Sequence, residues 1–78
     1  MGLFDRFKKK IDPEIQALID RLGSPDAPTR EAAARALGEL GERGADAQPA
    51  LEEALADEDG DVCLAASDAL SKIRKEAH

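Results

Sequence analysis

The feature that most constrains this chain is an internal repeat of thirty-three residues. When residues 17–40 are aligned with residues 50–73, eight of the twenty-four positions are identical. The identical pairs are Ala17 and Ala50, Leu18 and Leu51, Leu22 and Leu55, Asp26 and Asp59, Ala32 and Ala65, Ala33 and Ala66, Ala36 and Ala69, and Leu37 and Leu70. Such a spacing is typical of stacked helical hairpins, whose neighbouring units bury one another's apolar faces. A stack of this kind predicts a binding surface and indicates no particular chemistry.

The first copy contains two helix patterns. Asp12 followed by Pro13 predicts a helix start, because an aspartate caps free backbone N–H groups and proline is tolerated in the first turn. Apolar residues then recur at helical spacing up to Leu22, and residues 23–25 end the helix. Asp26 predicts the start of the second helix. That helix carries an alanine-rich face, and Gly38 is expected to weaken it.

The second copy follows a break at residues 41–44. Asp46 is expected to cap its first helix, which has Pro49 in its first turn. Residues 57–61 form an acidic turn, and a last helix is predicted from about Gly60 to Lys75. The close contacts between helices are expected at Ala32, Ala36, Ala65 and Ala69.

The N-terminal segment has a different character. Leu3, Phe4 and Phe7 fall on one side of a potential amphipathic helix, with basic residues opposite them. One interpretation is a structural cap over the open face of the first repeat. The alternative is attachment to a membrane surface, which the acidic remainder of the chain disfavours.

Composition narrows the classes of function. The formal net charge is −6, and residues 44–71 hold eight acidic residues and neither lysine nor arginine, which argues against nucleic-acid binding. Fifteen of the thirty-three hydrophobic residues are alanine, so the core is expected to be thin. The single cysteine, Cys63, allows no intramolecular disulfide, and no stretch approaches a signal-peptide core or a membrane span. A cytoplasmic location is expected.

The motifs of the two copies carry a family resemblance. The stretches SPDAPTREAAARALGELG and DEDGDVCLAASDALSKI, each preceded by a Leu-x-x-x-Leu helix, resemble the bacterial HEAT-like repeats first described in phycobilisome lyase subunits. The resemblance covers residues 13–76 and implies antiparallel helix pairs whose second helices line a concave binding side. Members of that family typically have Val-Arg near the start of the second helix, whereas this chain has Thr29-Arg30 in one copy and Val62-Cys63 in the other.

The fold prediction is therefore an all-α superhelix of two HEAT-like helical hairpins with a short N-terminal amphipathic helix. Residues 1–11 form the basic amphipathic helix, and residues 12–78 form the two repeats, at about 12–44 and 45–78.

The acidic turn has a partial likeness to a calcium loop. Asp57, Asp59 and Asp61 have the first spacings of such a loop, and Asp68 falls at its twelfth position. Glycine is needed at the sixth position, however, and this chain has Val62 there. The acids are better explained as helix-capping, solvated groups, and no metal site is predicted.

The repeats differ most at one pair of positions. Arg30 and Glu31 of the first copy are replaced by Cys63 and Leu64 in the second. Two interpretations stay open, since this strip either packs on a neighbouring helix or is an exposed contact for a partner or a second copy. A catalytic cysteine is disfavoured, because the lone histidine is His78 at the end of the chain.

The function predicted is a non-catalytic protein-binding module or small adaptor, without cofactor. Its partner would be a protein with a basic surface, and self-association is possible. The alternatives are a subunit of a lyase-type or other enzyme complex and a peripheral membrane adaptor. The candidate contact residues on the second helices and the acidic turn are Arg30, Glu31, Asp57, Asp59, Asp61, Cys63 and Leu64.

Overall fold

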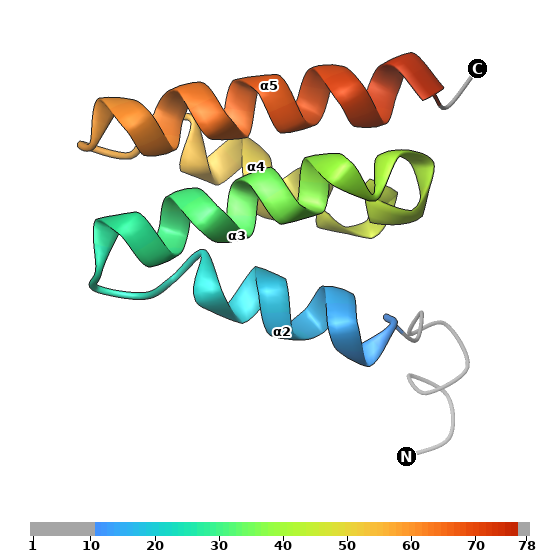
Figure 1. Cartoon of the computed structure of the whole chain (residues 1–78), viewed down its shortest axis with the longest axis horizontal. Coiled ribbons are helices and arrows are strands. Elements are labelled where there is room, and N and C mark those ends of the chain that lie inside the picture. The colour runs from blue at the N-terminus through green and yellow to red at the C-terminus, as the bar shows by residue number, and fades with distance from the viewer. Residues whose placement is uncertain (1–10, 77–78) are drawn as a thin grey trace.

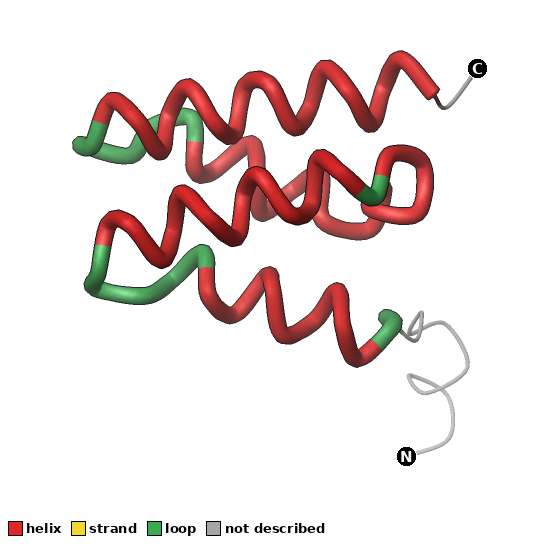
Figure 2. Tube along the Cα trace, viewed as in Figure 1, coloured by secondary structure: helices red, strands yellow, loops and turns green. Residues whose placement is uncertain are grey.

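A computed structural model describes residues 11–76 as an all-α stack of two helical hairpins (Figure 1). Its α-helices are α2 (Pro13–Arg21), α3 (Ala27–Glu39), α4 (Gln48–Ala54) and α5 (Gly60–Glu76), and a 3-10 helix, η1 (Gly41–Ala47), leads into α4. Short loops join these elements, and the described residues contain no strand (Figure 2). The fold prediction is confirmed for residues 11–76. The predicted helix at residues 1–11 lies outside the described residues except for Ile11.

Local chemistry sets where three of the helices begin. The Asp12 Oδ1 accepts a hydrogen bond from the Glu14 N–H at 2.9 Å, and the Asp26 Oδ2 accepts one from the Thr29 N–H at 3.2 Å. In α5 the Asp59 Oδ1 has the same role toward the Val62 N–H at 3.2 Å. Each carboxylate satisfies a donor that has no partner within its helix, as the sequence predicted.

The break between the repeats differs from the prediction. Residues 41–47 form the 3-10 helix η1, so α4 begins only at Gln48, with Ala47 as its N-cap residue. Asp46 lies inside η1, and its predicted role as the helix cap is wrong. Gly41 has a φ of 57°, a left-handed conformation that permits the chain to leave α3 and tighten into η1.

The core lies between the two hairpins. Figure 1 shows α3 between α2 and α5, with α4 behind it. The largest fully buried side chains are Leu37, Leu51, Val62 and Ile73, and the remaining buried apolar residues are mostly alanines. No polar or charged residue is buried among residues 11–76. Burial of apolar surface is thus what holds the helices together.

The helices α3 and α5 pack closely at Gly38. A Cβ atom placed on Gly38 would lie 2.8 Å from the Cα of Ala69, so the two helix backbones come close at this point. The glycine expected to weaken α3 is therefore the residue that admits the neighbouring helix.

One of the four predicted alanine contacts is confirmed, because Ala69 lies against Gly38 of α3. Ala65 and Ala69 are buried on α5. Ala32 is exposed, and Ala36 is only half-buried. The expectation for Ala32 is wrong, because no described residue covers its exposed side chain.

Candidate functional site

An ion pair joins the two repeats at the acidic turn. The Arg30 Nε lies 2.8 Å from the Asp57 Oδ2, and the Arg30 Nη2 lies 3.0 Å from the Asp57 Oδ1. The third guanidinium nitrogen, Nη1, donates to the Ser24 carbonyl oxygen at 2.8 Å. The side chains of Arg30 and Asp57 are only 16% and 13% exposed. This forked, two-bond geometry fixes the loop before α3 and the turn before α5 relative to each other.

The pair perturbs both of its members. The hydrogen bond from Arg30 lowers the pKa of Asp57 below its usual value of 3.8, and the Asp59 N–H and the Arg30 charge lower it further. The hydrogen bond to Asp57 likewise raises the pKa of Arg30. Each charged group stabilises the other, so both stay ionised at neutral pH.

Two carboxylates of the acidic turn accept hydrogen bonds from backbone N–H groups at the turn and the start of α5. The Asp57 Oδ1 accepts a hydrogen bond from the Asp59 N–H at 2.8 Å, and the Asp59 Oδ1 accepts one from the Asp61 N–H at 2.9 Å. Val62 is already in the first turn of α5, as the repeat predicted. Within residues 11–76 no three acids, histidines or cysteines lie where they could hold a metal ion. Of the three aspartates, only Asp61 has an exposed side chain that accepts no hydrogen bond from residues 11–76.

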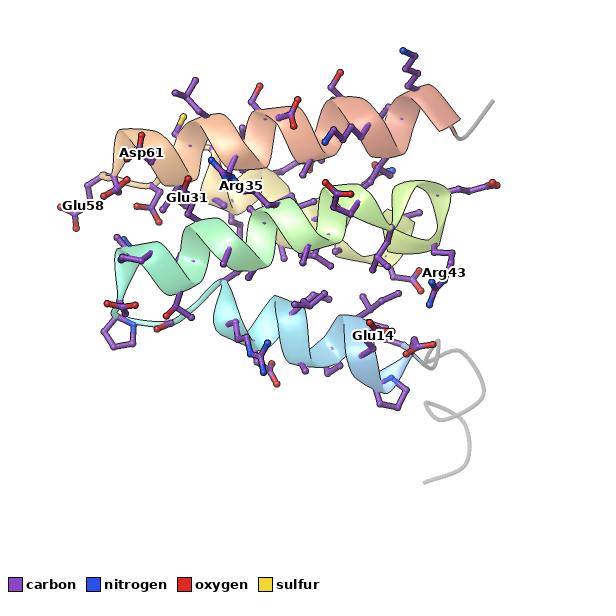
Figure 3. All side chains as sticks on the ribbon, viewed as in Figure 1. Glu14, Glu31, Arg35, Arg43, Glu58 and Asp61 are labelled. Atoms are coloured by element: carbon purple, nitrogen blue, oxygen red, sulfur yellow. The ribbon has the colours of Figure 1, made fainter. Side chains whose placement is uncertain are left out.

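Glu31 lies on α3, on the side turned toward α5. Its Oε2 is 2.8 Å from the Arg35 Nη2, a charge pair between residues one helical turn apart. Figure 3 shows both side chains extending from α3 toward α5, with Glu58 in the turn before α5 and Asp61 in its first turn. Glu31 is thus partly engaged within its own helix.

Cys63 is half-buried next to the end of α4. Its Sγ donates a hydrogen bond to the Leu55 carbonyl oxygen at 3.1 Å. In the first repeat the equivalent residue, Arg30, makes a similar contact with the Ser24 carbonyl. The thiol therefore replaces the guanidinium as a donor to the preceding loop.

Leu64 is the most exposed large apolar side chain in residues 11–76. It is 69% exposed on α5, so the interpretation that it packs inside the monomer is wrong. Asp61 lies three residues before it and Asp68 four residues after it, and these spacings place all three on one helix face. The Asp68 Oδ2 is 3.3 Å from the Lys72 Nζ. An apolar side chain thus stands among charged groups on the outside of the stack.

Sequence reasoning did not include two residues of this region. Leu55, at the end of α4, is 40% exposed and is the only other exposed large apolar residue in the described part of the chain. Asp68 was considered only as a calcium ligand, although its spacing from Leu64 places it on the same face. The seven candidate residues therefore do not all have the same role in the structure. Arg30, Asp57 and Asp59 shape the junction, whereas Leu64 and Asp61 face solvent.

The N-terminal candidates, Leu3, Phe4 and Phe7, lie outside the described residues. No helix within residues 11–76 is both long and apolar enough to cross a membrane.

Comparison with known proteins gives one family. The family model described as HEAT repeats matches residues 15–78. No curated protein and no solved structure matches the chain. The match names HEAT repeats as a whole, so the narrower resemblance to lyase-type repeats stays a prediction.

Proposed function

Because the chain belongs to the HEAT-repeat family, we propose that it is a non-catalytic protein-binding module that serves as a small adaptor. HEAT repeats generally mediate protein–protein interaction. Stacked repeats achieve this through extended surfaces and need no enclosed pocket. The two hairpins of this chain fit such a use, since their apolar residues form one shared core and leave the outer helix faces free.

The proposed contact surface is the outward face of α5 around Leu64, which we call the Leu64 face. It consists of Asp61, Leu64 and Asp68. The observation that carries the proposal is the 69% exposure of Leu64 at the position where the first repeat has Glu31. A single exposed leucine is common on protein surfaces. Here, however, the leucine replaces a charged residue of an otherwise similar repeat, and this replacement supports a role of Leu64 in binding.

The charge around the Leu64 face indicates the chemistry of the partner. Residues 44–71 contain eight acids and no lysine or arginine, so the second repeat projects a negative field. Such a field accelerates the approach of a basic protein, and Leu64 adds affinity by losing contact with water. We therefore infer a partner segment that is basic and partly apolar. Arg30, Asp57 and Asp59 contribute by holding the turn in shape.

The test is a comparison of wild-type protein with Leu64→Glu. The variant adds a charge to an exposed side chain, so its stability should stay within about 0.5 kcal/mol of wild type. It should lose the partner that wild-type protein retains in a pull-down with quantitative mass spectrometry, and the purified partner should bind it more weakly by titration calorimetry. The matched control is Ala17→Glu, which adds the same charge at an exposed position of α2.

Two outcomes would count against this function. A Leu64→Glu protein that folds normally and keeps every wild-type partner would remove the Leu64 face from consideration. A visible absorbance band in protein purified from its native source would point to a chromophore and favour the enzyme-subunit alternative. Loss of self-association in the variant would identify the partner as a second copy of the chain.

A further inference from the structure

The thirty-three-residue offset gives each residue of the first repeat a counterpart in the second. The counterparts of Ala32 and Ala36 are Ala65 and Ala69. Ala65 and Ala69 are 8% and 1% exposed, and Ala69 meets Gly38 of α3. Because both hairpins point the same way along the stack, Ala32 and Ala36 occupy the corresponding face of α3. That face is where a further element would pack.

This face of the first repeat forms an apolar hollow. Its lining is mostly apolar, with Leu18 and Arg21 from α2 and with Pro28, Thr29, Ala32, Ala33 and Ala36 from α3. Ala32 is exposed and Ala36 is half-buried. Alanine side chains allow a neighbouring element to approach the α3 backbone closely, just as Gly38 admits α5. Large apolar side chains of a further element could therefore pack against this lining.

The opposite end of the stack has a different surface. Ala34 and Gly38 are buried in the first repeat, and their counterparts on α5, Ser67 and Ser71, are exposed. Hydroxyl groups hydrogen-bond to water, whereas alanine methyl groups do not. The end formed by α5 is thus suited to solvent, and the end formed by α2 and α3 favours a cover.

We propose that Leu3, Phe4 and Phe7 of the same chain occupy this hollow. Ile11 packs against the core cluster, so the segment of residues 1–10 joins the described chain beside α2. Leu18 lies seven residues further along, about 10 Å at the rise of a helix. In the predicted helix the seven residues from Phe4 to Ile11 also span about 10 Å, which brings Phe4 level with Leu18 and Phe7 one helical turn nearer to Ile11.

The proposed occupant is a segment of this chain and not of another molecule, because the segment is covalently linked to α2. A short linker gives an attached segment an effective concentration in the millimolar range, which exceeds that of a second copy in dilute solution. The segment also brings the large apolar groups that the thin core lacks, since Phe4 and Phe7 are the only aromatic residues of the chain. Aromatic side chains bury more area than any other type.

The absence of tryptophan and tyrosine makes a direct test possible. In the full chain, Phe7→Trp introduces a single fluorophore. Docking in the hollow should shift its emission to shorter wavelength than that of a free tryptophan amide and protect it from acrylamide quenching. Adding Ala32→Glu at the exposed edge of the hollow should restore the emission of the free amide without lowering helicity by circular dichroism. The control, Ser67→Glu, adds the same charge at the opposite end and should leave the shifted emission unchanged.

The same fluorophore discriminates the other occupants. Emission like that of the free amide in the Phe7→Trp protein would overturn the proposal. A shift that disappears on dilution, together with a change from dimer to monomer in sedimentation, would overturn it in favour of a second copy. A shift that arises only with vesicles of phosphatidylcholine and phosphatidylserine would overturn it in favour of membrane attachment. A shift that Ala32→Glu leaves in place would show that the segment is buried elsewhere.

Discussion

The substitution Gly38→Ala tests whether the close approach of α3 and α5 is built into the chain. An alanine Cβ at this position would lie 2.8 Å from the Cα of Ala69 and 3.0 Å from its Cβ. Neither atom can move by rotating a side chain, so the whole of α5 must shift to accommodate the methyl group. Gly38 is also buried, so no solvent-filled space can receive it.

Two opposing effects set the magnitude. In a helix that makes no such contact, replacing glycine with alanine stabilises by about 1 kcal/mol, because alanine loses less backbone entropy. Inserting a methyl group into a closely packed contact costs about 1 to 3 kcal/mol. Since backbone atoms form the obstacle at Ala69, we expect the upper part of that range and a net loss of about 1 kcal/mol or more. A loss of 1 kcal/mol lowers the Tm of a domain this size by about 4 to 8 °C.

Thermal unfolding followed by circular dichroism measures this effect. The matched control is Gly60→Ala, because a Cβ at Gly60 meets nothing within 4 Å. That substitution should leave the Tm unchanged or raise it, since it reduces the freedom of the unfolded chain by about 0.4 to 1 kcal/mol. If Gly38→Ala raises the Tm as much as Gly60→Ala does, the two helices are not held at the distance described, and the reasoning is refuted.

Two further predictions concern contacts between α3 and the second repeat. Asp57 has a lowered pKa in the folded protein, so its stabilisation is fully present above pH 3.8 and is lost as the pH falls through the folded value. The stability advantage of wild type over Asp57→Asn in urea unfolding should therefore shrink below pH 3.8, and an advantage that stays constant would contradict the role of the Arg30 pair. Ala69→Leu should destabilise by about 1 to 3 kcal/mol, whereas Ser71→Leu on the exposed side of α5 should stay within about 0.5 kcal/mol. Equal effects would place the α3 contact elsewhere.

The sequence alone determined the features that depend on neighbouring residues. Asp12 and Asp26 cap their helices, because a carboxylate needs only the next two or three N–H groups to act. The alanine-rich face of α5 was expected to pack inward, and Ala65 and Ala69 are buried, since a helix with one apolar stripe has one side to bury. The repeat predicted the family and the all-α fold for the same reason, because each hairpin leaves apolar surface that only another hairpin covers.

The tertiary structure decided which copies of a repeated pattern are covered. Ala32 and Ala65 are the same residue in the same local pattern, yet Ala65 is buried in the core cluster and Ala32 is exposed. Likewise, Arg30 reaches Asp57 of the next repeat, while its counterpart Cys63 reaches only the Leu55 carbonyl. Local sequence cannot distinguish such copies, because their difference comes from position in the stack. The first repeat has a neighbour on the side of Arg30, and the corresponding side of the second faces solvent, which is where Leu64 and Leu55 are exposed.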